Sequence, residues 1–425
     1  MQSEKPTVIT PPLVNQIGKA PVLSHASGQG GDCFSYEYPK ESICETSSPD
    51  GSVYTFDIGT HRVYKTEDCY LALEFEAANG TTAPSGTAAG IYNMMQLFEN
   101  VQVRYNGRQV YNYFMDNMAY ITSLDVSQEY INSQPTFFIR GKSYDKLGIS
   151  STASETNTLL FTIPLSFIHS IWSSNLPFST LKLTQKFELI VQLKNDSTSY
   201  AKVLLGDSAT NVTIKLKKLR LGLFYAASKS AVEVYYKAIS SNKNLIYNGY
   251  NWARNVFSGK VDGNMMTQHG NKSHKSISKI AFMLRNGNKN INQTYDPSSV
   301  YLKKINLQLN TGDRVFKVDL LNSHEIRNVT MKAIGQNANY DGGLPTWFND
   351  MSTKQTIAVL SLDSFDGVAF DGYDCSQGQE FIIEYEIGGT ANTDYVLDVV
   401  YIYDVCNVIN YETQLFDEFQ DPSQI

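Results

Sequence analysis

The feature that most constrains this 425-residue chain is an internal duplication. Residues 97–111 (LFENVQVRYNGRQVY) have a counterpart roughly 205 positions later, in residues 301–316 (YLKKINLQLNTGDRVF). In both segments apolar residues alternate with polar ones, an Asn/Gly turn follows, and an apolar strand returns. Alternation places one strand face on a core, and Asn and Gly suit the positive φ of a tight hairpin. Each segment therefore predicts the same β-hairpin.

Three further strand-like segments follow in the same order in each half. They are residues 158–165, 187–193 and 212–225 in the first half, and residues 356–362, 381–387 and 395–409 in the second. This repetition predicts two copies of one β-domain, joined near residues 226–232. Each copy has the size and strand number of an eight-stranded jelly roll, in which two facing sheets avoid long exposed edges. Another kind of β-sandwich remains an alternative.

The predicted fold is therefore all-β, with two tandem eight-stranded jelly-roll barrels, inserted loops and short helices. Residues 1–32 are rich in Pro, Gly, Ser and Gln without a sustained period, which is typical of an extended arm. The expected divisions are an N-terminal arm at 1–32, the first jelly roll at 33–228, the second at 229–410 and an acidic C-terminal tail at 411–425.

Three segments between the predicted strands carry further expectations. Helical spacing of Met118, Ile121 and Leu124 predicts a short helix within residues 115–131. The connections over residues 116–156 and 226–276 are too long for simple hairpins. Long loops on a rigid barrel usually carry interaction surfaces.

The charge and hydropathy of the chain argue against two classes of partner. A net charge of −7 and a pI near 5.5, with no basic tail, argue against direct binding of nucleic acid phosphates. Residues 1–6 lack the order of a signal peptide. A membrane-spanning helix needs about 18 or more apolar residues in a row, and Asp398 and Asp404 interrupt the most apolar run. We expect no membrane span.

Candidate metal sites were sought among cysteines, histidines and acidic residues. The five cysteines are odd in number and form no CxxC pair, which favours free thiols in or near a core. His269 and His274 are five residues apart in a loop, a poor spacing for metal ligands. Asp363, Asp366, Asp371 and Asp374 offer calcium ligands in a Gly-rich loop, but without the EF-hand spacing. A polar turn after a strand is the interpretation we prefer.

Other motifs are weaker still. Residues 28–31 (GQGG) lack the strand, helix and lysine of a phosphate-binding loop. Residues 235–285 interleave basic and aromatic side chains, as single-stranded nucleic acid sites do, but an entry into the barrel plus a loop fits better. No nucleophile elbow or Ser/His/Asp set occurs. We assign no catalytic, cofactor or metal residue and expect a protein that is not an enzyme.

Two short segments resemble a known family. The first is IPLSF at 163–167, followed by NLPF at 175–178, Leu181 and the strand 187–193. The second is LQLNTGDR at 307–314, in which Thr311 precedes the glycine that follows Asn directly in the family. These segments are similar to the double jelly-roll major capsid proteins of tailless icosahedral DNA viruses, which include phages, adenoviruses, virophages and large nucleocytoplasmic viruses. The resemblance extends over about residues 34–410.

The resemblance implies a role as a major capsid protein in the virion. Three chains would form a pseudo-hexagonal homotrimer that tiles an icosahedral shell. Neighbouring capsomers and minor capsid or penton proteins would be its partners, and the termini would face them or an internal membrane. No sequence-specific contact with nucleic acid is implied. For the acidic tail, binding to basic partners and a frayed end are both open.

Two other functions remain open at this stage. A tandem β-sandwich is also compatible with a carbohydrate-binding, lectin-like protein that uses aromatic platforms or the Asp363–Asp374 loop. An enzyme on the same architecture, such as a peptide amidase or a polysaccharide-cleaving enzyme, would need a convergent acid/base or metal cluster, and no motif supplies one.

Overall fold

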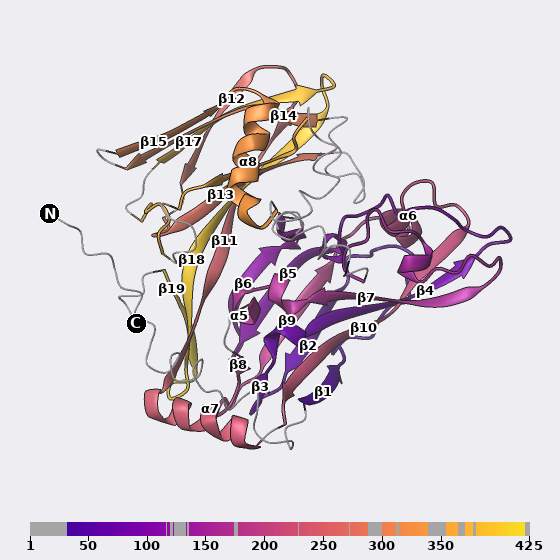
Figure 1. Ribbon diagram of the computed structural model, residues 1–425, viewed down its shortest axis with the longest axis vertical. Coiled ribbons are helices and arrows are strands. Elements are labelled where there is room, and N and C mark those ends of the chain that lie inside the picture. Colours follow the sequence, from indigo (N-terminus) through magenta and orange to yellow (C-terminus); the bar gives the residue numbers. More distant parts are fainter. Residues whose placement is uncertain are drawn as a thin grey trace.

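The computed structural model describes residues 32–115, 117–119, 122, 133, 136–173, 177–227, 229–271, 273–287, 300–311, 314–338, 354–363, 370–376 and 380–420. Two β-sandwiches lie next to each other, the first coloured indigo to magenta and the second pink through orange to yellow (Figure 1). Each sandwich contains two antiparallel sheets.

In the first sandwich, one sheet has the order β7-β4-β10-β3-β8, with β1 also paired to β10, and the other has the order β2-β9-β5-β6. The strands are β1 (Asp32–Glu37), β2 (Val53–Ile58), β3 (Val63–Tyr64), β4 (Tyr70–Asn79), β5 (Phe98–Tyr105), β6 (Arg108–Phe114), β7 (Thr156–Pro164), β8 (Phe178–Ser179), β9 (Phe187–Leu193) and β10 (Val212–Ala226).

In the second sandwich, the sheets have the orders β11-β18-β13-β16, with β19 also paired to β18, and β12-β17-β14-β15. The strands are β11 (Asn244–Lys260), β12 (Met265–Asn271), β13 (Ile277–Asn286), β14 (Val300–Thr311), β15 (Arg314–Leu320), β16 (Ile357–Ser361), β17 (Glu380–Gly389), β18 (Asp394–Asn410) and β19 (Leu415–Phe419).

The two sandwiches share one topology. With the short β3 and β8 and the terminal β19 set aside, the remaining strands of each sandwich can be numbered one to eight in chain order. Both sandwiches then have sheets of order 1-8-3-6 and 2-7-4-5. Two interlocked Greek keys give this arrangement, which is that of the jelly roll. The predicted pair of eight-stranded jelly-roll barrels is confirmed.

The matched sequence segments occupy equivalent places in the two barrels. The first pair forms the hairpins β5–β6 and β14–β15, and the later pairs form β7 with β16, β9 with β17, and β10 with β18. In the first hairpin, Asn106 and Gly107 have φ values of 51° and 74°, as predicted for a tight turn. The turn after Thr311 lies outside the described residues.

Helices connect the strands and cover one sheet. They are the α-helices α5 (Ser170–Ser173), α6 (Tyr200–Leu205), α7 (Lys229–Asn242) and α8 (Ser323–Ala338), and the 3-10 helices η1 (Thr66–Asp68), η2 (Met94–Leu97), η3 (Asp145–Leu147) and η4 (Leu165–Phe167). The junction predicted near 226–232 lies at the start of α7, which crosses the bottom of the molecule in Figure 1. Within the predicted helix 115–131, Met115, residues 117–119 and Thr122 are helical, and the rest lies outside the described residues.

The expectation of a long loop over residues 226–276 is wrong. The segment contains α7, the 17-residue strand β11, and β12. β11 escaped prediction because its burial does not alternate: Leu245 and Tyr247 are buried, whereas Val256 is 48% exposed. Different stretches of β11 face different neighbours, and this removes the period on which a strand prediction rests.

Each barrel has its own core, and a third cluster lies between them. Alternating residues of facing sheets fill the first core, with Leu71, Leu73 and Phe75 from β4. The second core contains Phe282 from β13 and Tyr385 from β17. Among the described residues, no helix is long and apolar enough to cross a lipid bilayer.

Candidate functional site: the contact between the two barrels

Strands of the second barrel extend into the core of the first. β11 and β18 pair along their whole lengths and run from the second barrel down to α7 (Figure 1). Near α7, the side chains of Leu245, Tyr247, Ile409 and Tyr411 belong to the core cluster of the first barrel. Burying large aromatic side chains is among the strongest stabilising contributions a contact can have. The two barrels are therefore joined by a shared core.

Hydrogen bonds fix this shared core to β8 of the first barrel. The Tyr411 hydroxyl donates to the carbonyl oxygen of Ser179 at 2.8 Å, and the Ser179 N–H donates to the Tyr247 hydroxyl at 3.0 Å. Burial raises the pKa of both tyrosines above the ordinary value, so both hydroxyls stay protonated and able to donate.

An apolar face of the second barrel packs against the first. The outer face of its β11-β18-β13-β16 sheet is apolar, and it forms a separate cluster with Tyr92 of the first barrel. The buried members are Tyr92, Ala281, Met283, Ile357, Val359, Val400 and Ile402, with Trp252, Met331 and Ala333 packed against them. Met331 and Ala333 belong to α8, so α8 and the first barrel together cover this face.

A buried carboxylate lies at the centre of the contact. Asp398 on β18 is fully buried and accepts two hydrogen bonds from Arg285, from Nε at 2.6 Å and from Nη2 at 3.2 Å. Arg254 lies 3.7 Å from the same carboxylate. Asn117 of the first barrel donates to Asp398 at 3.3 Å and accepts from Arg254 at 3.3 Å. A buried charge needs such pairing, and here the pairing spans both barrels.

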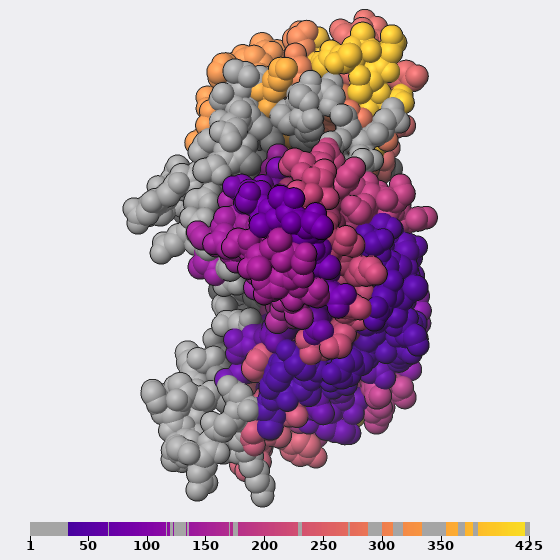
Figure 2. Space-filling view, turned by 90° about the vertical axis from the view of Figure 1, so that its right-hand side faces the viewer, coloured from indigo at the N-terminus to yellow at the C-terminus, as the bar shows by residue number. Residues whose placement is uncertain are grey.

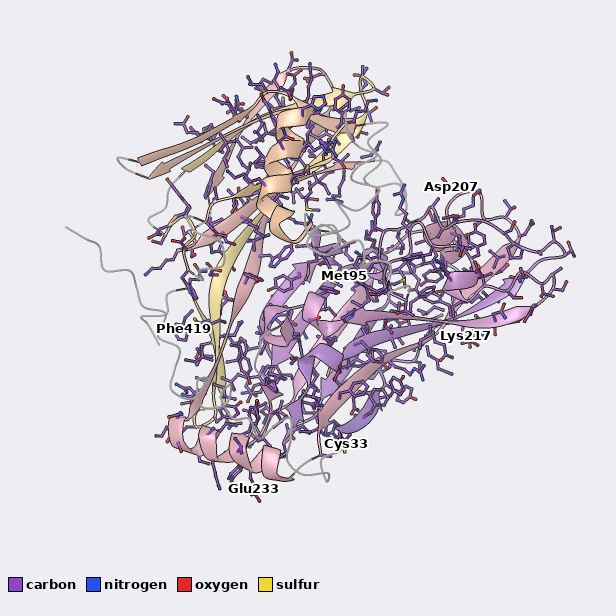
Figure 3. All side chains as sticks on the ribbon, viewed as in Figure 1. Cys33, Met95, Asp207, Lys217, Glu233 and Phe419 are labelled. Carbon is purple, nitrogen blue, oxygen red and sulfur yellow. The ribbon has the colours of Figure 1, made fainter. Side chains whose placement is uncertain are left out.

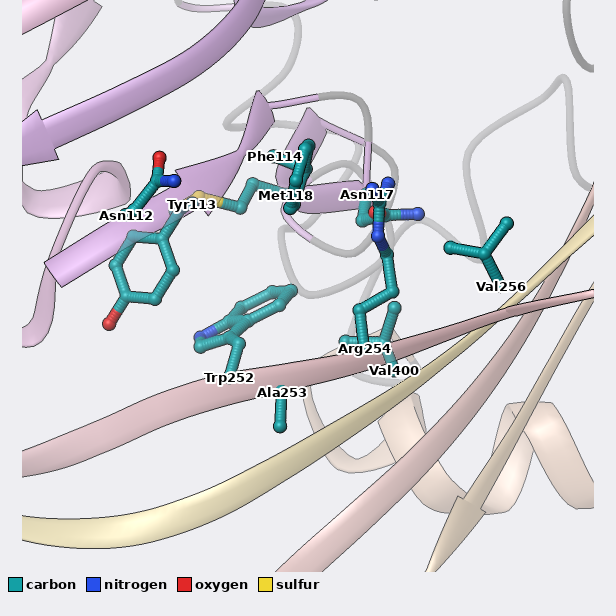
Figure 4. Close-up of a pocket in the computed structure, with 10 residues that line it drawn as sticks. All are labelled: Asn112, Tyr113, Phe114, Asn117, Met118, Trp252, Ala253, Arg254, Val256 and Val400. Atoms are coloured by element: carbon teal, nitrogen blue, oxygen red, sulfur yellow. The ribbon is translucent and has the colours of Figure 1, made fainter. Parts of the chain in front are cut away.

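Arg254 also stacks on the first barrel. Its guanidinium carbon lies 3.4 Å from the centroid of the Phe114 ring, at the end of β6. The planar cation and the aromatic face attract each other. Beside this pair is a cavity of about 300 Å³ lined by both barrels, in which Trp252 and Tyr113 face one another (Figure 4). Arg254, Asn117 and Asp398 together form a clamp that links the two barrels.

The two barrels use different surfaces in this contact. The first barrel contributes Tyr113 and Phe114 of β6, an edge strand of its β2-β9-β5-β6 sheet. The second barrel contributes the outer face of its other sheet, through Trp252, Arg254 and Val400. A contact between unlike surfaces of two similar units is heterologous. Because the barrels share one topology, the first barrel keeps an unused copy of the sheet face, and the second barrel keeps an unused copy of the edge strand.

A buried histidine adjoins the contact. His169, which precedes α5, stacks on Tyr111 with ring centroids 3.8 Å apart, and its Nδ1 accepts the Ile171 N–H at 3.0 Å. Burial lowers the pKa of His169 to about 3, because the imidazolium form loses its hydration there. Tyr113 lies in the same stack, 5.6 Å from His169 between ring centroids. His169 is therefore a neutral packing residue near neutral pH.

The candidate metal ligands that the structure describes do not form a metal-binding cluster. His269 lies on β12, whereas His274 stacks on Tyr403 with ring centroids 3.8 Å apart. Asp366 of the proposed calcium loop lies outside the described residues, as do residues 28–31. Asp404 accepts from Ser276 at 2.6 Å and from the Phe370 N–H at 2.9 Å, which ties this loop to β18. Within the described parts of the chain, no three His, Cys, Asp or Glu side chains are placed to hold a metal ion.

The basic and aromatic residues of the 235–285 stretch have structural partners. Tyr247 is fully buried and Trp252 packs between the barrels. Lys243 pairs with Glu412 at 2.7 Å, and Lys260 lies 3.6 Å from Asp394. This arrangement favours the barrel interpretation over a nucleic acid platform.

The five cysteines carry free thiols. Cys69, Cys375 and Cys406 are buried, as expected for packed thiols, whereas Cys44 is exposed and Cys33 is half-buried. The acidic tail also differs from a frayed end, since Leu415–Phe419 forms β19 on β18 and Phe416 packs in the first core. Glu418 there receives a hydrogen bond from Asn251, and burial raises its pKa.

The residues of the clamp were missed in the sequence. Asp398 was noted only as a break in an apolar run. A single acidic residue inside an otherwise apolar strand is itself a signal, because burial of the strand forces the carboxylate to find cationic partners. Its partners Arg254, Arg285 and Asn117 are far away in sequence and carried no such mark.

Comparison with known proteins gives the fold. No protein-family model and no curated protein sequence matches this chain. The mavirus major capsid protein matches at 10% identity with a TM-score of 0.56, over 92% of this chain and 91% of that one. The Faustovirus major capsid protein matches at 12% identity with a TM-score of 0.55, over 89% and 90% of the two chains. This chain has the double jelly-roll fold of capsid proteins.

A further match extends the same result. The structure of the Sputnik virophage matches at 12% identity with a TM-score of 0.55, over 92% of this chain and 89% of that one. The likeness covers both barrels, so it includes their tandem arrangement as well as the single jelly roll. The resemblance stated from short sequence segments is thus confirmed at the level of the fold.

Proposed function

We propose that this protein is the major capsid protein of an icosahedral virus and resides in the virion shell. The observation that carries the proposal is one topology built twice in one chain, with the copies joined by a heterologous contact. The match to viral major capsid proteins over about nine-tenths of both chains supports it. We assign the protein a structural and not an enzymatic role, and we assign it no catalytic, cofactor or metal residue.

The building block is a homotrimer. If the contact between the first and second barrels recurs between the second barrel and the first barrel of the next chain, three chains close a ring of six similar units. Such a ring has a nearly hexagonal outline and tiles a flat facet. A permanent assembly of this kind buries about 2,000–5,000 Å² at each interface.

The chain divides according to this role. The first jelly roll occupies residues 33–228 and the second occupies residues 229–410. The arm at 1–32 and the acidic residues of the segment 411–425 serve contacts with neighbouring capsomers, minor capsid or penton proteins, or an internal membrane, while Phe416 of that segment packs in the first core. The net charge of −7 supports an assembly without sequence-specific contact to the genome.

Light scattering and electron microscopy of the purified full-length protein test the proposal. A particle of three times 47.6 kDa with a hexagonal outline is the expected result. A stable monomer that binds sugars would instead support the lectin-like alternative and overturn the capsid role.

A further inference from the structure

The register of the two matched hairpins assigns an equivalent of Phe114 in the second barrel. Val101 on β5 pairs with Tyr113, and its equivalent Ile305 on β14 pairs with Leu320. Tyr113 and Leu320 are both buried, which supports this alignment. The residue that follows is then Phe114, the last residue of β6, in the first barrel and Leu321, the first residue after β15, in the second.

The two equivalents have different surroundings. Phe114 is covered by the Arg254 guanidinium of the second barrel. Leu321 is 57% exposed, the second most exposed of the large apolar side chains in the described parts of the chain after Tyr38. Exposed leucines are individually ordinary, but this one occupies the position that makes the barrel-to-barrel contact in the other copy.

The surface that contacts Phe114 within the chain also has an unused copy. The surface in use is the outer face of the second barrel's sheet that contains β11, β13 and β18. The matching face of the first barrel, on β1, β4 and β10, carries a cluster of aromatic side chains that we name the aromatic patch. It consists of Phe34, Tyr36, Tyr70 and Phe224.

The aromatic patch is packed within itself but open to the outside. Phe34 lies 4.4 Å from Phe224 and 4.6 Å from Tyr36 between ring centroids, and it is 40% exposed. Gly222 beneath it leaves room for the rings, since a Cβ there would lie 2.9 Å from Tyr70. Cys33, which precedes Phe34 on β1, and Lys217 on β10 are labelled in Figure 3. The indigo part of the first barrel lies on the surface below the orange and yellow second barrel (Figure 2).

We propose that the end of β15, with Leu321 at its tip, docks on the aromatic patch of a second copy of this chain. The inference rests on the proposed capsid trimer and names the surfaces that close it. Leu321 would take the place on that patch that Phe114 takes beneath Arg254 within the chain.

Charge supports a second copy as the occupant. Leu321 is flanked by Asp319 and by Glu325, which accepts the Leu321 N–H at 2.6 Å. The aromatic patch is bordered by Arg220, whose guanidinium carbon lies 4.4 Å from the Tyr36 ring centroid, and by Arg62 over Tyr225. Both arginines also pair with carboxylates of the same barrel, Arg220 with Glu74 at 2.9 Å and Arg62 with Glu37 at 3.6 Å. The acidic residues beside Leu321 would therefore meet arginines that can share their hydrogen bonds with a second carboxylate, an arrangement that favours a specific contact.

Two single variants and their mixture test the docking pair. Leu321→Asp places a charge at the apolar tip, and Phe34→Asp places a charge in the aromatic patch. Each charge would lie at the centre of the proposed contact. Each is expected to weaken self-association by about 30-fold or more and to yield monomers, because a central apolar anchor carries much of the binding energy. An equal mixture still contains one intact tip and one intact patch, so it should form one-to-one dimers but no trimers. Analytical ultracentrifugation at matched concentrations measures all three.

Controls separate the possible failures. Val53→Asp, at an exposed apolar residue on β2 outside both surfaces, should remain a trimer. Circular dichroism checks that each variant is folded, and Phe34→Ser replaces Phe34→Asp if that variant is not. If the wild-type protein is a monomer, the proposed trimer itself fails. If the wild type and both variants are trimers, or if the mixture of two monomeric variants forms no dimer, the docking pair is overturned while the capsid role stands.

Discussion

The eighth strands of the two barrels, β10 and β18, occupy the same place in the topology but have different surroundings. In β10, buried Ile214, Leu216 and Leu219 alternate with charged residues that face outward. In β18, every residue from 397 to 409 is buried. One face of each strand lines its own jelly-roll core. The difference comes from the other face, which is open in the first barrel and covered in the second.

This difference shows how one fold supports two roles. The outer face of β18 joins the second barrel to the first and to α8, so its stabilisation is already present in a single chain. The outer face of β10 carries salt bridges and the aromatic patch, which a single chain leaves uncovered. Substitutions on the two faces should therefore differ in their effect on the stability of the monomer.

The largest effect is expected at the clamp. Asp398→Ala removes the acceptor of Arg285 and Arg254 and should lower the free energy of unfolding by about 3–5 kcal/mol, because two partly buried cations lose their partner. Denaturant unfolding measures the loss. Asp394→Ala, on the same strand but paired with Lys260 at the surface, is the matched control and should cost at most about 1 kcal/mol. Equal losses for the two variants would contradict the clamp.

The outer faces themselves give the next contrast. Ile402→Ala opens a cavity between the barrels and should cost about 2–4 kcal/mol. Lys215→Ala, on the outer face of β10, should change the free energy of unfolding by less than about 0.5 kcal/mol. Thermal unfolding of both variants measures the contrast. A small loss for Ile402→Ala would mean that the barrels are held together elsewhere.

The buried histidine next to the contact predicts a loss of stability in mild acid. The pKa of His169 is lowered in the folded chain, so the unfolded chain binds the proton first as the pH falls below its ordinary value near 6.5. Stability is fully present above that pH and is lost as the pH falls toward 3. Between pH 7.5 and 5.5 the wild type should lose about 1.4 kcal/mol more than His169→Asn. Parallel pH profiles for the two proteins would rule out this role.

The smallest effect is expected among the surface charges of β10. Lys218 lies 2.8 Å from Glu74 and is 53% exposed, so Lys218→Ala should cost only about 0.2–1 kcal/mol. Added salt screens such a pair. In about 1 M salt, denaturant unfolding should give the same free energy of unfolding for Lys218→Ala and for the wild type. A difference that persists at high salt would point to packing by the lysine stem instead.

Much of the fold could be predicted from the sequence because the same alternation of apolar and polar residues occurs in both halves of the chain. The alternation in residues 97–111 and 301–316 marked the same hairpin twice, and the later pairs fixed the order of the strands. β11 could not be predicted, since Tyr247 faces the first core and Val256 faces solvent. A strand with mixed neighbours has no single period.

The contact between the barrels was less accessible to sequence analysis. Asn117 and Asp398 are in contact although they lie 281 positions apart in the sequence. No local sequence pattern indicates a contact between residues so far apart. The aromatic residues illustrate the same limit. Tyr54, Tyr64 and Tyr200 fill the first core, whereas Phe34 remains at the surface. Burial, which separates these groups, is set by the tertiary fold.

A cryo-electron microscopy map of the assembled full-length protein tests the central claim most directly. The account predicts a closed ring of three chains in which Leu321 of each chain lies against Phe34 and Phe224 of the next. A two-fold dimer that joins like surfaces, or a trimer whose chains meet elsewhere and leave the aromatic patch in solvent, would contradict it.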